Sequence, residues 1–126
     1  MQKYIKYPAL WHDYKFDFRI YVLITSVIDP MTVFLFNDGL VRLASEKYQG
    51  SKDTTDAYKH LTNYSLNKKN ENFDDEVHKL KLSDCLRGTL TQKPYKPSKP
   101  SACRTADSIW AEIESIVVKT VLTVQP

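Results

Sequence analysis

The sequence lacks the features of a membrane or secreted protein. It contains no apolar run near the roughly 18–20 residues that a membrane-spanning helix requires. Its first residues, Met1–Tyr4, also lack the basic-then-apolar order of a secretory signal. We therefore expect a cytoplasmic chain with no membrane association.

Cysteine is scarce, which bears on metal and redox chemistry. Only Cys85 and Cys103 occur, and neither has a second cysteine or a histidine at the short spacing of a zinc site. This favours two reduced thiols over a disulfide or a metal pair, and no metal ligand is predicted. The sequence also contains no Gly-rich phosphate loop, no assignable Ser-His-Asp order and no carboxylate pair at a defined spacing.

The overall composition describes an ordinary globular chain. Its 126 residues are 42% hydrophobic and 26% charged, which is enough for one hydrophobic core. The formal net charge of +3 suits an acidic partner without identifying one. No recognition helix or aromatic RNA-binding motif accompanies that charge, so nucleic acid is not a predicted partner.

Alternating and β-branched segments predict a sheet in the first third of the chain. Residues 16–24 alternate in the period of a strand, and residues 32–36 are rich in β-branched and aromatic side chains. Asn37-Asp38-Gly39 has the residue types of a tight hairpin turn, so residues 40–44 are expected to return as a third strand. The prediction is a three-stranded antiparallel meander.

The remainder predicts loops and helices. Residues 45–59 are assigned to a loop or a short irregular helix, and the charged segment 68–76 to a solvated loop. A short helix is expected around residues 80–90. From Thr105 onward, apolar residues recur every three or four positions, which predicts an amphipathic helix that ends near Val124. The fold class is therefore α+β, with an antiparallel sheet as its core.

Lys15, Asp17 and Arg19 are spaced by two residues and so share one face of the first strand. A ladder of surface ion pairs is one interpretation, because exposed charges commonly contribute little. The apolar Tyr21 and Leu23 continue the same face, which favours the rim of a cleft instead. Cations at such a rim, with Arg42, could neutralise phosphate charge during phosphoryl transfer.

Two polar segments are further candidates. The segment 60–65 (HLTNYS) places five hydrogen-bonding side chains in six positions, an arrangement that is costly to bury unless each finds a partner. It fits either a ligand-lined loop or a polar surface turn. The segment Gln2–Ile5 could hydrogen-bond an adenine edge, or form an ordinary edge strand.

Three segments together resemble the tubulin tyrosine ligase-like family, in particular its glutamylase branch. They are residues 15–23 (KFDFRIYVL), 36–42 (FNDGLVR) and 60–65 (HLTNYS), and the similarity extends from Gln2 nearly to Gln125. The resemblance implies an ATP-grasp fold, which uses ATP to activate a carboxylate as an acyl phosphate and joins it to glutamate. The implied partners are acidic tubulin tails on microtubules and free L-glutamate, and the implied location is the cytoskeleton, with cilium or basal body among the sites.

The resemblance also assigns roles to individual residues. It places Gln2, Lys3, Tyr4, Ile5, Lys15, Asp17, Thr62 and Asn63 at ATP contacts, and Arg42, Tyr64, Ser65 and Lys79 at the site for free glutamate. Lys79 is chosen because it lies four residues before Ser83, as the family's lysine precedes a Leu-Ser pair. Arg19 and His60 match positions in the catalytic cleft that stabilise the phosphate or acyl phosphate.

Residues 1–126 are accordingly expected to form a partial domain of this family. In the family, a phosphate-covering Gly-rich segment lies before the position of Gln2, and the magnesium ligands lie beyond the final helix. We therefore expect ATP and Mg²⁺ as cofactors, metal ligands outside this sequence, and no ligase activity from the chain alone. The alternative is a non-catalytic remnant that binds nucleotide or tubulin.

A basic, proline-rich loop is expected at residues 91–105. Lysine and proline each recur every three residues from Lys93 to Pro100, which in a polyproline II helix would align the lysines along one edge. This edge suits an acidic polypeptide such as a tubulin tail. A stiff solvated linker is the other interpretation.

Overall fold

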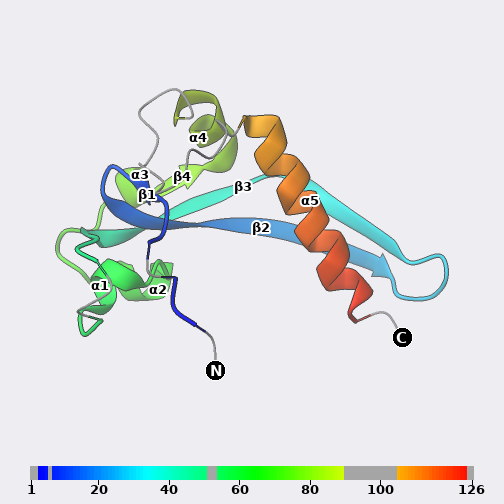
Figure 1. Cartoon of the computed structure of the whole chain (residues 1–126), viewed down its shortest axis with the longest axis horizontal. Helices are drawn as coiled ribbons and strands as arrows, with labels where there is room; N and C mark the ends of the chain where they lie inside the picture. The colour runs from blue at the N-terminus through cyan, green and yellow to red at the C-terminus, as the bar shows by residue number, and fades with distance from the viewer. Residues whose placement is uncertain (1–2, 6, 51–53, 90–104, 125–126) are drawn as a thin grey trace. The chain divides into compact units, whose positions relative to one another are not determined.

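A four-stranded antiparallel sheet and five helices make up the described part of the chain, which in this computed structural model comprises residues 3–5, 7–50, 54–89 and 105–124. The strands are β1 (Leu10–Trp11), β2 (Tyr14–Ser26), β3 (Thr32–Lys47) and β4 (Lys79–Lys81), in the order β1-β2-β3-β4 (Figure 1). The helices are α1 (Ala57–His60), α2 (Tyr64–Asn67), α3 (Asp75–His78), α4 (Leu82–Thr89) and α5 (Ala106–Leu122). The α+β class is as predicted.

The predicted hairpin turn at Asn37-Asp38-Gly39 is wrong, because β3 runs straight through it. The carboxylate of Asp38 instead accepts hydrogen bonds from the backbone amide and the hydroxyl of Ser83, both at 2.9 Å, at the start of α4. A negative charge is favoured there by the helix dipole. The side chain of Asp38 thus bonds to a residue far away in the sequence instead of closing a turn. The three predicted strands are two long strands in the structure, β2 and β3.

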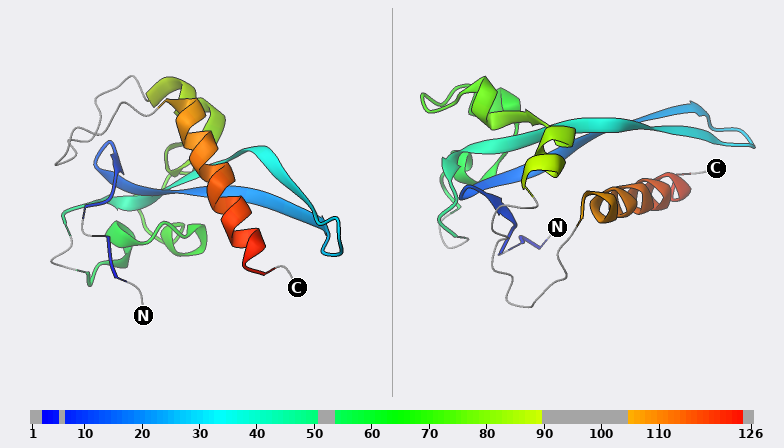
Figure 2. Two further views of the ribbon diagram at one scale, coloured as in Figure 1. Left: turned by 45° about the vertical axis from the view of Figure 1, so that its right-hand side comes forward. Right: turned by 90° about the horizontal axis from the view of Figure 1, so that it is seen from above.

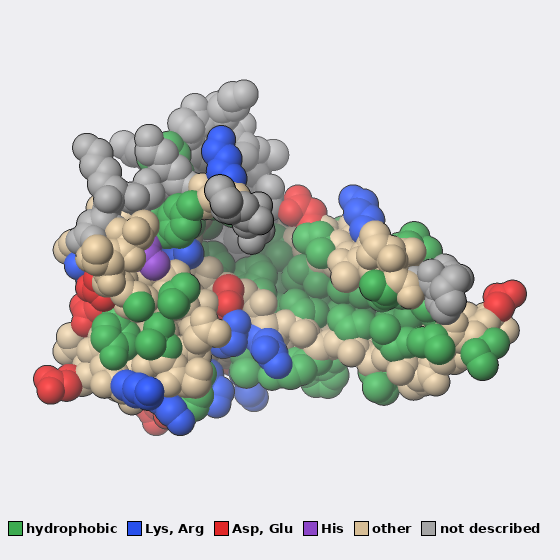
Figure 3. Space-filling model, turned by 90° about the horizontal axis from the view of Figure 1, so that it is seen from below, with side chains coloured by type: hydrophobic (Ala, Val, Ile, Leu, Met, Phe, Trp, Pro, Cys, Tyr) green, Lys and Arg blue, Asp and Glu red, His purple; other side chains and the backbone are tan. Residues whose placement is uncertain are grey.

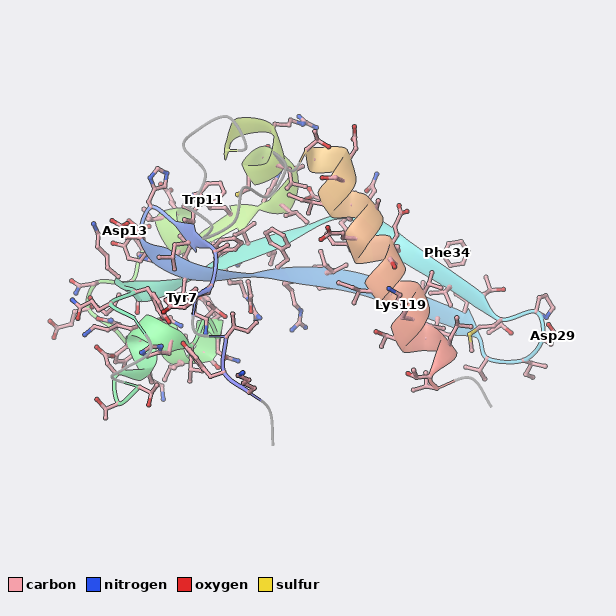
Figure 4. All side chains as sticks on the ribbon, in the orientation of Figure 1. Tyr7, Trp11, Asp13, Asp29, Phe34 and Lys119 are labelled. Carbon is pink, nitrogen blue, oxygen red and sulfur yellow. The ribbon has the colours of Figure 1, made fainter. Side chains whose placement is uncertain are left out.

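The hairpin that the sequence analysis missed joins β1 to β2. Its two-residue loop is His12-Asp13, with positive φ angles of 47° and 73°, and Trp11 pairs with Tyr14 across it. Two successive residues with positive φ are the requirement of a tight type I′ turn. Figure 4 labels Trp11 and Asp13 at this turn. The dipeptide His12-Asp13 is a weaker sequence signal for such a turn than Asn-Gly, so the turn was not predicted.

The chain divides into two compact units, each of which includes part of β2 and part of β3. The first comprises Met1–Arg19 and Leu40–Lys81, and the second Ile20–Gly39 and Leu82–Pro126. In the first unit the core lies under β3, where Val41, Leu43 and Ala44 are at most 2% exposed. On β2 the aromatic rings of Phe16 and Phe18 lie side by side, with centroids 5.5 Å apart, on the face opposite to Lys15 and Asp17.

The second unit has a small core around α4 and α5. Leu82, Cys85 and Leu86 are buried at helical spacing on α4, and Ile113 is buried on α5. Thr105 caps α5, because its hydroxyl oxygen accepts a hydrogen bond from the Ser108 amide. Within this unit, α5 lies along one side of the β2–β3 ribbon (Figure 2).

Much of the apolar surface of the second unit is exposed. The exposed side chains include Tyr21, Val22, Leu23, Ile24, Phe34 and Phe36 on the strands and Ile116, Val118 and Leu122 on α5. Figure 3 shows hydrophobic side chains gathered along the strands on one face. Along β2, consecutive exposed residues from Tyr21 to Thr25 show that both faces of the strand are open. The alternation therefore identifies the strand but not a buried face, because residues 14–18 are half-buried on both faces.

The thiol of Cys85 is a packing group. Burial, and secondarily the nearby carboxylates of Asp84 and Asp38, raise its pKa to about 11. A thiol that stays protonated near neutral pH is a poor nucleophile and a poor metal ligand. Cys85 is free, as predicted, while Cys103 lies outside the described residues. Over the described part of the chain, no helix is both long and apolar enough to cross a membrane.

Replacing Leu82 should test the core of the second unit. Its side chain is 0% exposed, so Leu82→Ala should lower the free energy of unfolding by about 2–5 kcal/mol. The matched control is Leu122→Ala, at a position that is 60% exposed, where a change within about 0.5 kcal/mol is expected. Urea unfolding followed by tryptophan fluorescence measures both, and equal losses would contradict this core assignment.

Candidate functional site

A paired carboxylate and guanidinium join β2 to β3 at the centre of the candidate site. Arg42 donates from Nε to one oxygen of Asp17 at 2.8 Å and from Nη2 to the other at 2.6 Å. The hydroxyl of Thr62 donates to Asp17 at 2.8 Å. The two side chains of the ion pair are 23% and 37% exposed, so the pair is partly shielded from water. This bidentate geometry fixes both groups more firmly than a single contact would.

A second cluster surrounds the side chain of Lys15, which stands on the same face of β2 as Asp17. Its ammonium group donates to the backbone carbonyl of His60 at 2.9 Å and to the Tyr4 hydroxyl at 3.4 Å. The Tyr4 hydroxyl also shares a hydrogen bond of 2.7 Å with Nδ1 of the buried His60. The ring of Tyr48 packs edge-on against His60 at 5.4 Å. Burial, together with a hydrogen bond to Tyr4, raises the pKa of the Tyr48 hydroxyl.

A third group of side chains gathers where β3 pairs with β4. Lys79 is the direct antiparallel partner of Arg42, so the two side chains stand on the same face of adjacent strands. The ammonium group of Lys79 lies 5.3 Å from the ring centroid of Tyr64, a cation–π distance. Lys68 makes a similar contact with the same ring at 5.7 Å. Two lysines thus lie near the ring of Tyr64, and one of them, Lys79, also stands opposite Arg42 of the ion pair.

Asn67 holds the segment 60–65 in place. Its side chain is 1% exposed, and its oxygen accepts from the amide and the hydroxyl of Ser45, both at 2.8 Å. Its NH₂ group donates to the carbonyls of Leu61 at 2.8 Å and Asn63 at 3.0 Å. One amide therefore ties this segment to β3 by four hydrogen bonds.

An outer layer of amides supports the same part of β3. Asn70 donates to Ser45 Oγ and to Glu46, and Asn72 donates to Glu46 at 2.8 Å. These hydrogen bonds, from Asn72 first and Asn70 second, lower the pKa of Glu46. The segment 68–76, expected to be a solvated loop, is thus anchored to the sheet by its asparagines.

The structure brings together most of the residues that the sequence analysis assigned to a site. Tyr4, Lys15 and His60 form one cluster, Asp17, Arg42 and Thr62 a second, and Tyr64 and Lys79 a third. Lys3, Ile5, Arg19, Asn63 and Ser65 are exposed positions of the same unit. Gln2 and the basic loop at 91–105 lie outside the described residues, apart from Thr105. Asp17 and Arg42, which were assigned to different ligands, are partners of each other.

Other residues of the site were missed by sequence reasoning. Asn67, Tyr48, Phe73 and His78 belong to its supporting contacts, yet each is a single polar or aromatic residue in an unremarkable context. One signal was available for Asn67, because it follows Asn63 by four residues, the spacing of a hydrogen bond within one helical turn.

The clusters present cations, and among the described residues they form no metal site. No group of three or more His, Cys, Asp or Glu side chains among the described residues could hold a metal ion. The half-buried Lys15 is held in place by two oxygen acceptors, the Tyr4 hydroxyl and the His60 carbonyl, and its ammonium group is a cation of the kind that neutralises phosphate oxygens. The pairing of Arg42 opposite Lys79 suits a small ligand that carries carboxylates.

The chain matches known proteins over its whole length. A family model described as "Tubulin-tyrosine ligase family" matches residues 1–125. Tubulin polyglutamylase TTLL7 of Xenopus tropicalis is 40% identical over 132 residues, covering 100% of this chain and 13% of the relative. The human tubulin polyglutamylase TTLL7 is 40% identical over 128 residues, with 100% and 14% covered. Tubulin monoglutamylase TTLL4 of Mus musculus is 42% identical over 134 residues, with 100% and 10% covered. The chain thus spans 10–14% of the length of these relatives.

Removing the Asn67 amide should loosen the segment 60–65. Asn67→Ala leaves the Ser45 amide and two backbone carbonyls without their partner, and each unsatisfied buried group costs about 1–3 kcal/mol. We expect a loss of at least about 2 kcal/mol in the free energy of unfolding, with faster amide hydrogen exchange at residues 61–63.

The control is Asn37→Ala, at an exposed position of β3. It should change stability by no more than about 0.5 kcal/mol and leave exchange at residues 61–63 unchanged. If Asn67→Ala behaves like this control, the four hydrogen bonds do not anchor the segment.

Proposed function

Since the chain belongs to the tubulin-tyrosine ligase family, we propose that it forms the nucleotide- and glutamate-binding part of an ATP-dependent ligase that adds glutamate to tubulin. Relatives from frog, human and mouse are named as tubulin polyglutamylases or a monoglutamylase, which supports glutamate as the added amino acid. The acceptor would be a glutamate side chain in an acidic tubulin tail. The place of action would be the microtubule cytoskeleton.

The ATP side of the proposed site is the cluster around Lys15. Lys15 and Arg19 are cations on one face of β2, where they can neutralise phosphate oxygens, and the phenol of Tyr4 lies beside Lys15 with its ring centroid 4.8 Å from the ammonium group. Thr62 and Asp17 provide neighbouring polar groups for the nucleotide. When bound, ATP supplies the phosphoryl group that activates the acceptor carboxylate. His60, which is buried, would hold Tyr4 and Lys15 in place through its imidazole and its backbone carbonyl.

The glutamate side of the proposed site rests on one observation, the direct pairing of Arg42 with Lys79 across β3 and β4. Two cations on one face of adjacent strands suit the two carboxylates of glutamate. Asp17 orients the Arg42 guanidinium through Nε and one Nη. Tyr64, which contacts Lys79, would border the same ligand, with Ser65 next to it in α2.

We also propose an ATP-grasp architecture and Mg²⁺ as a cofactor, because the resemblance to the family implies both. The antiparallel sheet, with a nucleotide cluster on one face of β2, is compatible with that architecture. The described residues do not form a metal site, so none of them is proposed as a ligand of Mg²⁺.

A chimaera tests the proposal directly. In the human polyglutamylase relative, the matching segment of 128 residues would be replaced by this chain, and incorporation of labelled glutamate into tubulin would be measured. We expect the chimaera to be active. Arg42→Ala in it should raise the apparent KM for glutamate about 10- to 100-fold, the equivalent of losing one charge-assisted contact, and raise the KM for ATP much less.

Arg87→Ala, at an exposed position of α4, is the matched control and should leave both KM values unchanged. An inactive chimaera beside an active human parent would overturn the proposed function. Equal losses for ATP and glutamate in Arg42→Ala would remove Arg42 from the amino-acid site.

A further inference from the structure

An aromatic stack stands behind Tyr64, and neither the sequence motifs nor the proposed function assigns it a role. The ring of Phe73 packs edge-on against Tyr64 at 5.7 Å and an interplanar angle of 75°. On Phe73 the imidazole of His78 is stacked at 5.3 Å and 29°. Tyr14 of β2 closes the stack by contacting His78 edge-on at 5.6 Å. Three rings, those of Tyr14, His78 and Phe73, thus connect the sheet to the partly exposed Tyr64.

The stack is anchored at its buried end. His78 is 5% exposed, and its Nδ1 lies 3.1 Å from the backbone amide and 3.0 Å from the carbonyl oxygen of Asp74, the N-cap residue of α3. Its Nε2 is buried without a hydrogen-bond partner among the described residues. Leaving a buried polar atom unpaired costs stability. A leucine at this position would bury apolar surface without that cost, whereas the imidazole adds a flat ring that stacks on Phe73.

The exposed end of the stack meets the cations. Tyr64 is 41% exposed. An exposed ring and a long lysine side chain such as that of Lys79 adopt many conformations unless a neighbouring group restricts them. Phe73 restricts the Tyr64 ring, and the face of that ring attracts the Lys79 ammonium group at 5.3 Å. The backbone pairing places Lys79 opposite Arg42, and the contact with Tyr64 restrains the ammonium group of Lys79.

We propose that Phe73 and His78 are positioning residues for the binding of a dicarboxylic amino acid: through Tyr64 they hold the Lys79 ammonium group at the distance from Arg42 that lets the two cations grip separate carboxylates. This inference rests on the proposed function, since it assumes that glutamate binds at Arg42 and Lys79. Preorganising a long cationic side chain removes part of the entropy that binding would otherwise cost.

The test is titration of the 126-residue chain with L-glutamate and, separately, with ATP, followed by NMR. Phe73→Leu keeps the apolar bulk but removes the ring, while Phe73→Tyr keeps the ring. We expect Phe73→Leu to raise the Kd for glutamate about three- to tenfold, the equivalent of one aromatic pair, and Phe73→Tyr to leave it within about twofold. The Kd for ATP should be unchanged in both variants, which a general loss of structure would not allow.

His78→Leu supplies an independent variant. It should raise the Kd for glutamate in the same direction, and combining it with Phe73→Leu should add little, because both act through Tyr64. Saturable glutamate binding that Phe73→Leu and His78→Leu leave intact would overturn the inference and keep the proposed function. Absence of glutamate binding by the parent chain would overturn both the assignment of glutamate to this site and the inference that depends on it.

Discussion

The ion pair between Asp17 and Arg42 is the interaction on which the rest of the site depends. It connects β2 to β3 side by side, and through Thr62 it fixes the segment that carries His60, Asn63 and Tyr64. Its bidentate form sets the direction of the guanidinium, and partial burial limits competition from water. Without the ion pair, the sheet would still place these strands side by side, but the guanidinium of Arg42 would lose the contact that fixes its direction.

A consequence is that the two ligands of the proposed reaction share one structural element. Asp17 belongs to the face of β2 that carries Lys15, and Arg42 belongs to the strand pair that carries Lys79. A change in Asp17 should therefore alter the orientation of Arg42, and the proposed binding of glutamate at Arg42 would alter the charge balance at Asp17. Coupling of this kind suits an enzyme that must hold a nucleotide and an amino acid at the same time.

The sequence predicted the parts of this arrangement that local patterns encode. The alternation of residues 16–24 identified β2, and the spacing of Lys15 and Asp17 identified the face that meets His60 and Arg42. The resemblance to known ligases selected residues that the structure joins into three clusters. Local patterns failed where a distant partner decided the outcome: Asp38 bonds to Ser83 instead of closing a turn, and β3 continues to Lys47.

The supporting contacts could not be predicted from the sequence, because they too form between segments that are distant in the chain. Asn67, Phe73 and His78 acquire their roles only when β3, α2 and α3 meet, and none of them belongs to a periodic pattern or a motif. In the second unit the alternation of β2 could not reveal that residues beyond Ile20 are open on both faces, because burial depends on what covers a strand.

A double-mutant cycle between Asp17 and Arg42 tests the central claim most directly. The free energies of unfolding of Asp17→Asn, Arg42→Gln and the double variant would be compared with those of a cycle at Asp13 and Lys47, an exposed pair 3.5 Å apart. If the Asp17–Arg42 pair organises the site, its coupling should be about 1 kcal/mol or more, at or above the upper end for exposed pairs, and that of the control pair close to zero. Equal coupling in the two cycles would show that the Asp17–Arg42 pair is an ordinary surface contact and would contradict the account.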